Sequence, residues 1–273
     1  MDGQGAEVSD ANTRPLAVVT GASAGLGVLF ARELAKKGYD LVIAARRLDR
    51  LEELAKSIEA DSGITVHPVR ADLSTPEGPR DLMERVDAIG APLSVVINNA
   101  GFGMLGDFEE MSIDRQLQMI DLNIRALVAL THAGVVRMTA HGQRGYILNV
   151  GSLAGHQPMP YFAAYAATKA FVRDFSEAVS LELKGTPVTI TCLEPGGTHT
   201  DFTAVAGMHL AGAAGATMMN AQTVVDIGLN ALFRGRSRVV AGVLNKAAAC
   251  AVSALPRGLI ARVGGALMSA STK

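Results

Sequence analysis

Residues 15–27 read PLAVVTGASAGLG, an apolar run that passes directly into closely spaced glycines. The run predicts a buried β-strand, and the glycines allow a tight turn into a helix. Such a turn brings backbone N–H groups close to a pyrophosphate at the positive helix N-terminus. Because the spacing is GxxxGxG rather than GxGxxG, a plain strand-to-helix turn is the alternative at this point. The predicted cofactor contacts of this loop are Gly21, Ser23, Gly25, Leu26 and Gly27.

The alternation of apolar runs with helical periodicity continues along the chain. The predicted strands cover 15–20, 39–45, 64–69, 93–98, 145–150, 188–193 and 238–242, and the later predicted helices cover 112–140, 161–184 and 221–233. Gly38, Gly63 and Gly90 follow three of the helical stretches, where a helix favours a left-handed C-cap residue. Continuous apolar strands indicate that helices cover both sheet faces. The sequence therefore predicts one Rossmann-type, doubly wound α/β domain over 15–242, with a seven-stranded, mostly parallel sheet.

Composition narrows the class of protein. Of 273 residues, 49% are hydrophobic but only 4% are aromatic, and there is no Trp, so the core is built mainly from aliphatic side chains. The net charge of −1 gives no reason to expect nucleic acid as a partner. Cys192 and Cys250 form no disulfide framework or metal-ligand pattern. We therefore expect no metal and a reducing, cytoplasmic location.

The two ends of the chain differ from its centre. Residues 1–14 are polar, lack the layout of a signal peptide and predict a disordered tail. No uninterrupted apolar run approaches the roughly 18 residues of a membrane-spanning helix. Residues 243–273 form a basic, apolar extension, since no Asp or Glu follows Asp226. We expect the apolar face of this extension to pack on the domain or on a second subunit. Peripheral contact of the basic extension with an anionic membrane is the alternative. Pro256 and the pair Gly264–Gly265 are expected to break its helix.

Three polar features after the strands point to the cofactor. Arg46 and Arg47 follow the second strand, where an acid would select NAD, and arginine suits the 2′-phosphate of NADP. Two solvated surface arginines are the alternative. Asp72 suits either the adenine amino group or a helix cap. The turn NNAG at 98–101 contributes predicted contacts from Asn99, Ala100 and Gly101, or simply supplies turn residues. The sequence thus predicts NADP(H).

The stretch NVGSLAGHQPMPYFAAYAATKAF at 149–171 carries the reactive groups. Tyr165 and Lys169 are four residues apart at a helix start, so they share one face. Ser152 lies thirteen residues before Tyr165, just past a strand end. Taken alone, the Tyr–Lys pair also fits a half-buried tyrosine beside a snorkelling lysine.

In this order, TGxxxGxG, NNAG, Ser152 and YxxxK resemble the short-chain dehydrogenase/reductase family, close to its broad ketone, 17β-hydroxysteroid or oxoacyl reductases. The resemblance implies that Asn123 is the catalytic asparagine holding a water, and that Lys169 binds the nicotinamide ribose. It also implies that the PG motif at 195–200 lies beside the nicotinamide, with contacts from Pro195, Gly196, Thr198 and Thr200. One departure is Gly151, where many members have a second serine.

The resemblance and proton balance together predict transfer of a hydride between NADP(H) and an apolar ketone or secondary alcohol. Tyr165 is the expected acid/base, its pKa lowered by Lys169 and the cationic nicotinamide, with Ser152 holding the carbonyl oxygen. The alternatives are an epimerase and an NADP-binding regulator without turnover. We expect substrate contacts from three segments: 102–105, 156–162 and an apolar lid at 202–219. Within the second segment, Tyr161 is expected to line the substrate site, and His156 is expected to be a polar loop residue without a catalytic role. We expect a homodimer or homotetramer.

Overall fold

The computed structural model describes residues 14–199, 206 and 218–269. Seven strands form one sheet in the order β3-β2-β1-β4-β5-β6-β7, and every neighbouring pair is parallel. Each predicted strand is present, with bounds that differ by at most two residues. The strands are β1 Leu16–Thr20, β2 Asp40–Ala45, β3 Val66–Arg70, β4 Leu93–Asn98, β5 Gly145–Val150, β6 Val188–Glu194 and β7 Arg238–Val240.

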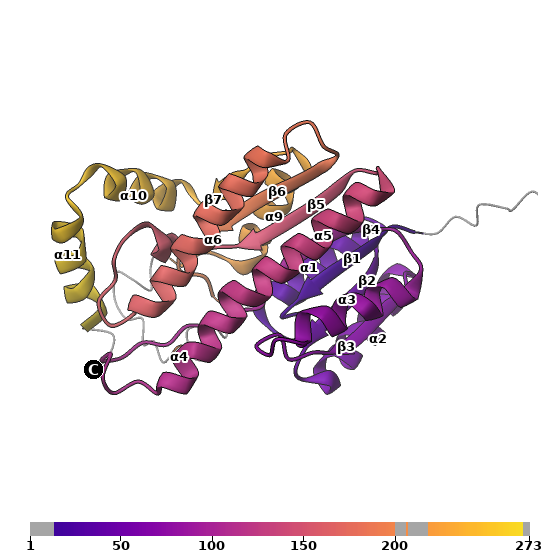
Figure 1. The fold of residues 1–273 in the computed structure, drawn as a ribbon, viewed down its shortest axis with the longest axis horizontal. Helices are drawn as coiled ribbons and strands as arrows, with labels where there is room; N and C mark the ends of the chain where they lie inside the picture. The colour runs from indigo at the N-terminus through magenta and orange to yellow at the C-terminus, as the bar shows by residue number, and fades with distance from the viewer. Residues whose placement is uncertain (1–13, 200–205, 207–217, 270–273) are drawn as a thin grey trace, which may run out of the picture.

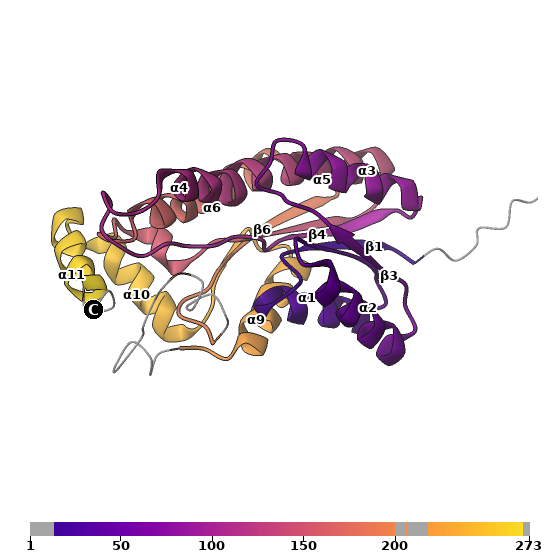
Figure 2. The same cartoon turned by 90° about the horizontal axis from the view of Figure 1, so that it is seen from below.

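Helices cover both faces of this sheet (Figures 1 and 2). One layer holds α1 Gly25–Lys36, α2 Leu48–Ser62 and α9 Ala221–Phe233. The opposite layer holds α3 Gly78–Ile89, α4 Ile113–Ile120, α5 Leu127–His141 and α6 Ala163–Glu182. The prediction of a doubly wound α/β domain is confirmed.

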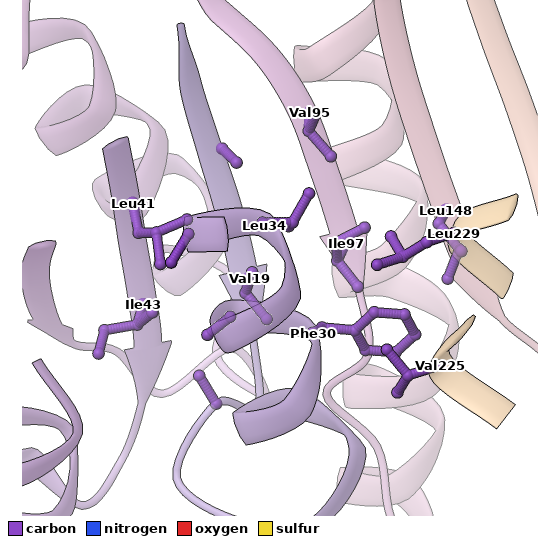
Figure 3. Packing of buried hydrophobic residues seen from close by; sticks show 14 of the residues in the cluster. Val19, Phe30, Leu34, Leu41, Ile43, Val95, Ile97, Leu148, Val225 and Leu229 are labelled. Atoms are coloured by element: carbon purple, nitrogen blue, oxygen red, sulfur yellow. The ribbon is translucent and has the colours of Figure 1, made fainter. Parts of the chain in front are cut away.

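The alternation of side chains along each strand explains why the strands are apolar throughout. In β1, Ala17 and Val19 face the cluster under α1 and α9, whereas Leu16 and Val18 face the cluster under α3 and α5. Figure 3 shows the first of these clusters, in which Phe30 of α1 packs near Ile97 and Val225. Because helices cover both faces, both sets of positions are mainly apolar, and buried polar side chains such as Asn98 and Asn149 hydrogen-bond each other.

The predicted helix ends are confirmed at three glycines. Gly38, Gly63 and Gly90 have φ values of 84°, 62° and 75°, in the left-handed region. Gly63 and Gly90 cap α2 and α3 directly, as their backbone N–H groups close the last turn. Glycine adopts this conformation without the steric cost of a Cβ atom.

The predicted helix at 112–140 is not uniform. It is divided into α4, a π-helical turn at Asp121–Ala126 and α5. By length and composition alone, Ile113–His141 could cross a membrane, with a hydropathy of 1.4 in its most apolar window. Its side chains Met119, Leu127 and Leu130 are buried, and Figure 2 shows the segment lying along the sheet. The segment therefore packs one face on the sheet, while Ile113, Leu117 and Val136 are exposed.

The C-terminal extension forms α10 Val243–Ala254 and α11 Arg257–Ser269. Both lie at the end of the molecule opposite the entry into β1 (Figures 1 and 2). The break at Pro256 is confirmed, but the predicted break at Gly264–Gly265 is wrong, because α11 continues through both glycines. A Cβ atom on Gly265 would lie 3.1 Å from Pro160 Cγ, so glycine lets α11 approach the loop before α6 closely.

Candidate active site

The glycine loop joins β1 to α1 and has the shape needed to hold a dinucleotide. Gly21 and Gly25 adopt φ values of 66° and 57°, which favour glycine. A Cβ atom on Gly27 would lie only 2.3 Å from the backbone oxygen of Gly21, so the turn closes only around a glycine. Ser23 and Leu26 are half-buried beside this turn. The positive N-terminus of α1 thus opens onto a compact loop, a geometry that fits a pyrophosphate.

Thr20, the last residue of β1, organises this end of the sheet. Its Oγ1 donates to the backbone oxygen of Ile97 at 3.1 Å and accepts from the backbone nitrogens of Asn99 and Ala100, both at 3.0 Å. Asn99 Nδ2 in turn donates to the backbone oxygen of Thr20 at 2.9 Å. The polar groups of the NNAG turn thus tie that turn to the glycine loop. The sequence analysis missed Thr20, although a polar residue closing an apolar strand was a visible signal.

Replacing Thr20 by Val should destabilise the fold while preserving its shape. Valine keeps the side-chain volume but leaves the N–H group of Ala100 without its acceptor, at about 1–3 kcal/mol for an unsatisfied group. The N–H group of Asn99 keeps the backbone oxygen of Ile97, at 3.1 Å. Urea unfolding would measure the loss, and Thr20→Ser, which keeps the oxygen, is the matched control. Equal stability of the Val and Ser variants would contradict this role.

Arg46, Arg47 and Asp72 lie near one another at the ends of β2 and β3. Arg47 Nη2 donates to Ser23 Oγ of the glycine loop at 3.1 Å. Partial burial would raise the pKa of Asp72, but hydrogen bonds from Ser74 and the charge of Arg46 lower it overall. Asp72 Oδ1 accepts from the backbone nitrogen and the hydroxyl of Ser74 at 3.0 and 2.6 Å. Asp72 therefore forms a local turn before α3, with Arg46 near its carboxylate and Arg47 in contact with the glycine loop.

Ser152, Tyr165 and Lys169 come together at the carboxyl end of the sheet. Ser152 follows β5 and hydrogen-bonds Tyr165. Lys169 Nζ lies 5.7 Å from the centroid of the Tyr165 ring and donates to the backbone oxygen of Val150 at 2.7 Å. Helix α6 begins at Ala163 rather than at 161, because Tyr161 has a φ of 63°. Tyr165 and Lys169 therefore occupy the first two turns of α6, on one face.

Asn123 lies in the π-helical turn between α4 and α5 and is buried. Its Oδ1 accepts from the backbone nitrogen of Phe102 at 3.2 Å, and its Nδ2 donates to the backbone oxygen of Phe102 at 3.0 Å and to Thr168 Oγ1 at 3.1 Å. A Cβ atom on Gly101 would lie 2.9 Å from Asn123 Oδ1 and 3.6 Å from Lys169 Nζ. The amide thus reaches the edge of the site, and the π turn, a feature common at functional sites, places it there.

Steric crowding explains why residue 151 is a glycine and not a serine. A Cβ atom there would lie 2.9 Å from Cys192 Sγ and 3.4 Å from Glu194 Cγ, so no serine fits beside these side chains. The backbone nitrogen of Gly151 still donates to the backbone oxygen of Leu193 at 2.7 Å. The missing second serine therefore leaves the loop after β5 anchored to β6.

Burial dominates the ionisation of the two reactive groups. It raises the pKa of Tyr165 to about 12, and the hydrogen bond from Ser152 offsets only part of this rise. Burial also lowers the pKa of Lys169 to about 8. The expectation was that Lys169 lowers the pKa of Tyr165, but burial has the larger effect, so the net shift is upward. The expectation also included the cationic nicotinamide, whose effect on the pKa of Tyr165 is separate from that of the protein's own groups.

The lowered pKa of Lys169 predicts a pH-dependent stability. Between about pH 8 and the ordinary lysine value of 10.5, the unfolded chain binds more protons at this site than the folded chain. The free energy of unfolding should therefore rise with pH in this window, by at most about 1.4 kcal/mol per pH unit. Relative to Lys169→Met, the unaltered protein should gain stability from pH 7.5 to 9.5, as measured by urea unfolding. Lys56→Met, an exposed position on α2, is the control. If the difference in the free energy of unfolding between the unaltered protein and Lys169→Met is the same at both pH values, the lowered pKa of Lys169 is refuted.

The PG motif continues from β6 across the site. The backbone oxygen of Pro195 accepts from the backbone nitrogen of Leu153 at 2.8 Å, which ties the motif to the loop carrying Ser152. Gly196 lies against Asn245 of α10, and Thr198 pairs with Met219 as an isolated bridge. Thr200 lies outside the described residues, as does the predicted lid at 202–219 apart from 206, 218 and 219.

An apolar cluster surrounds the reactive tyrosine. It joins the predicted substrate segments 102–105 and 156–162 to α4 and α6. Its buried members are Phe102, Met119, Phe162, Tyr165 and Ala206, and its partly buried members include Met104, Leu105, Ala154 and Met159. Tyr161 is half-buried at the same loop. His156 belongs instead to a buried charge network with Glu194 and Arg238, which the sequence analysis missed.

Comparison with known proteins matches this architecture to one family. The sequence profile of the short chain dehydrogenase family matches residues 15–211. The chain is 37% identical over 196 residues to a sulfoacetaldehyde reductase of Chromohalobacter salexigens, covering 68% of this chain and 74% of that protein. It is 34% identical over 190 residues to an NADP-dependent 3-hydroxy acid dehydrogenase of Schizosaccharomyces pombe, covering 69% and 73%.

A solved structure agrees over nearly the whole fold. A short-chain dehydrogenase from Sphingobium yanoikuyae in complex with NADPH has a TM-score of 0.78 and 30% identity, covering 89% of this chain and 97% of the other. The arginine pair beside the glycine loop fits the same cofactor. The chain therefore belongs to the short chain dehydrogenase family and is an oxidoreductase that uses NADP(H).

Proposed function

We propose that the protein transfers a hydride between NADP(H) and an apolar ketone or secondary alcohol, with Tyr165 as the general acid/base. The observation that carries this proposal is the hydrogen bond between Ser152 and Tyr165 inside a cluster of apolar side chains. A carbonyl oxygen beside both hydroxyls would have its apolar substituents in contact with Phe102, Phe162 and Met159. The described part of the site thus combines two polar groups with an apolar wall, as specific ligand sites do.

The protein's own residues account for the proton half of the reaction. Bound NADPH supplies the hydride, and the carbonyl oxygen must gain a proton. The phenol of Tyr165 carries its proton at neutral pH, which is the form that donates during reduction. Burial raises its pKa to about 12 and so weakens it as an acid, and the positive charge of the oxidised nicotinamide would lower that pKa again. Ser152 would hold the oxygen as negative charge develops on it. Lys169 would bind the nicotinamide ribose, and Asn123 would hold a water that returns protons toward Lys169.

Substrate chemistry is the part of the proposal that needs a direct test. The relatives include a sulfoacetaldehyde reductase and a 3-hydroxy acid dehydrogenase, whose names indicate small anionic substrates. A panel of acetophenone, 2-decanone, an oxoacyl thioester, sulfoacetaldehyde and a 3-hydroxy acid, followed by NADPH absorbance, separates these classes. We expect the apolar ketones to be reduced with the highest kcat/KM. Preference for the anionic compounds would overturn the apolar assignment, and no turnover with any compound would favour a regulator or an epimerase.

We also propose that the enzyme is a cytoplasmic homodimer or homotetramer whose C-terminal extension packs on the catalytic domain. Asn245 of α10 lies against Gly196, and Gly265 of α11 lies against Pro160. These contacts favour packing over the membrane alternative, although Val243 and Leu244 remain exposed. Flotation with anionic liposomes is expected to leave the full chain in the unbound fraction. Binding that is lost when the chain ends at Leu244 would contradict this.

A further inference from the structure

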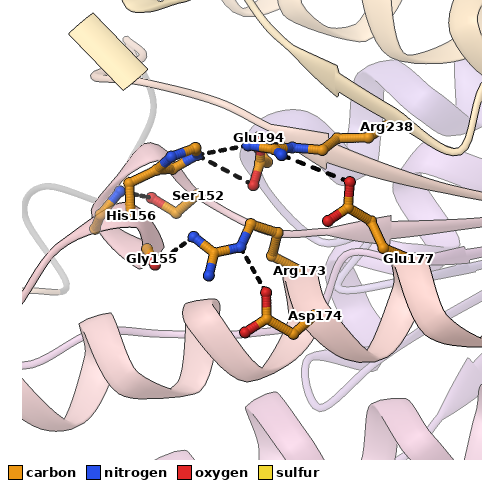
Figure 4. A network of polar contacts seen from close by, with 9 residues as sticks. Ser152, Gly155, His156, Arg173, Asp174, Glu177, Glu194 and Arg238 are labelled. Carbon is orange, nitrogen blue, oxygen red and sulfur yellow. Dashed lines mark hydrogen bonds and ion pairs between the residues drawn. The ribbon is translucent and has the colours of Figure 1, made fainter. Parts of the chain in front are cut away.

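A buried charge network lies beside the active site but has no role in the reaction described above. Glu194, the last residue of β6, is fully buried, and its Oε2 accepts from Arg238 Nε of β7 at 2.7 Å. Arg238 Nη1 also lies 3.5 Å from Glu177 Oε1 of α6. His156 Nε2 lies 3.3 Å from Glu194 Oε1 and 3.2 Å from Arg238 Nη2 (Figure 4). The network therefore joins three elements of the fold to the residue that ends the loop after β5.

This loop, residues 151–156, carries Ser152 and is here called the serine loop. On the side of β6, the backbone nitrogens of Gly151 and Leu153 donate to Leu193 and Pro195 at 2.7 and 2.8 Å. On the side of α6, Arg173 Nη1 donates to the backbone oxygen of Gly155 at 2.9 Å (Figure 4). His156 adds a third attachment, at the far end of the loop. Ser152 thus lies on a segment held from two sides.

Burying Glu194 carries a desolvation cost that its pairing with Arg238 must offset. A buried ion pair does not by itself show a contribution to the free energy of unfolding. The position of this pair beside the active site is therefore the more informative observation. Glu194 directly precedes Pro195 and Gly196, and His156 follows Ser152 by four residues. The contact between Glu194 and His156 therefore connects the PG motif to the loop that holds the substrate oxygen.

The imidazole suits this position because a single atom can serve either neighbour. Without a proton, Nε2 accepts from Arg238, and with a proton it donates toward Glu194. Glu194 Oε1 has no hydrogen-bond partner among the described residues, which leaves it available to His156. A glutamine head carries both a donor and an acceptor and could replace both contacts, whereas leucine fills similar space and offers neither.

We propose that His156 is a positioning residue: it ties the serine loop to the buried Glu194–Arg238 pair and so holds the Ser152 hydroxyl beside Tyr165. The consequence for turnover rests on the proposed function, but the tether itself does not. When the tether is lost, the loop end moves, and Ser152 no longer meets the carbonyl oxygen in the reactive geometry. The glycine loop and the arginine pair, which hold most of the cofactor, lie far from His156, so NADPH binding should largely persist.

The first measurement needs no substrate. Deuterium exchange of the peptide covering 151–156 should be faster in His156→Leu than in the unaltered protein, and close to the unaltered rate in His156→Gln. His67→Leu, on the edge strand β3, is the matched control. Unchanged exchange in His156→Leu would overturn the tether whether or not a substrate is known. If the Leu variant does not fold, His156→Asn, which is polar but too short to reach both partners, replaces it with the same expectation.

The second measurement is turnover of acetophenone with NADPH. His156→Leu should lower kcat by roughly 10- to 100-fold, the scale of a misplacement of about 1 Å, with the dissociation constant of NADPH changed less than about twofold. His156→Gln should restore kcat to within roughly threefold of the unaltered value. Equal loss in the Leu and Gln variants, or full activity in the Leu variant, would overturn the positioning role. Absence of acetophenone turnover in the unaltered protein would count against the proposed function alone, since the exchange result decides the tether.

Discussion

Replacement of Tyr165 by Phe is expected to lower kcat by roughly 10²- to 10⁴-fold, the usual contribution of a positioned general acid. The change removes one hydroxyl from a buried ring and little packing volume. The hydrogen bond to Ser152 is lost with it, whereas the glycine loop and the arginine pair are untouched. NADPH should therefore bind the variant nearly as well as the unaltered protein, as measured by fluorescence titration.

Tyr146→Phe is the matched control for this experiment. Tyr146 lies on β5, with its ring in an edge contact 4.9 Å from the centroid of Phe233, well outside the site. Its replacement should leave kcat unchanged. Substantial turnover by Tyr165→Phe would show that another group supplies the proton, and loss of NADPH binding in that variant would show that the tyrosine is structural.

The double variant Arg46→Asp/Arg47→Asp is expected to abolish the preference for NADPH. Each charge-assisted contact to the 2′-phosphate contributes about 1.5–3 kcal/mol, and two new carboxylates would repel the phosphate. We therefore expect the dissociation constant of NADPH to rise by roughly 10²-fold or more, since each 1.4 kcal/mol is tenfold. NADH, which has no 2′-phosphate, should bind about as before.

Arg50→Asp controls for the change in net charge. Arg50 is exposed in the first turn of α2, close in sequence to the pair. Its replacement should have little effect on either cofactor. A similar loss of NADPH affinity in the control would mean that the effect comes from the change in net charge and not from contacts of Arg46 and Arg47. Equal affinities of the unaltered protein for NADPH and NADH would contradict the assignment of these arginines to the 2′-phosphate.

The sequence by itself determined the layers and the order of the functional groups. Most of the strands are buried on both faces and mainly apolar, and such apolar runs predicted all seven strands. The four-residue spacing of Tyr165 and Lys169 fixed their common helix face, because helix geometry relates residues that are close in the chain. Glycines at left-handed positions, such as Gly63, marked helix ends for the same local reason.

Tertiary structure decided what depends on residues far apart in the chain. Thr20 meets Ala100 across 80 positions, and Arg238 meets His156 across 82. No periodicity encodes such contacts. The charge state of Tyr165 was also a tertiary outcome. Sequence reasoning counted the neighbouring Lys169, but burial by elements packed around the phenol has the larger effect and raises its pKa. Short-range geometry is fixed by the order of residues, whereas burial and the solvation of charge are fixed only when the chain packs.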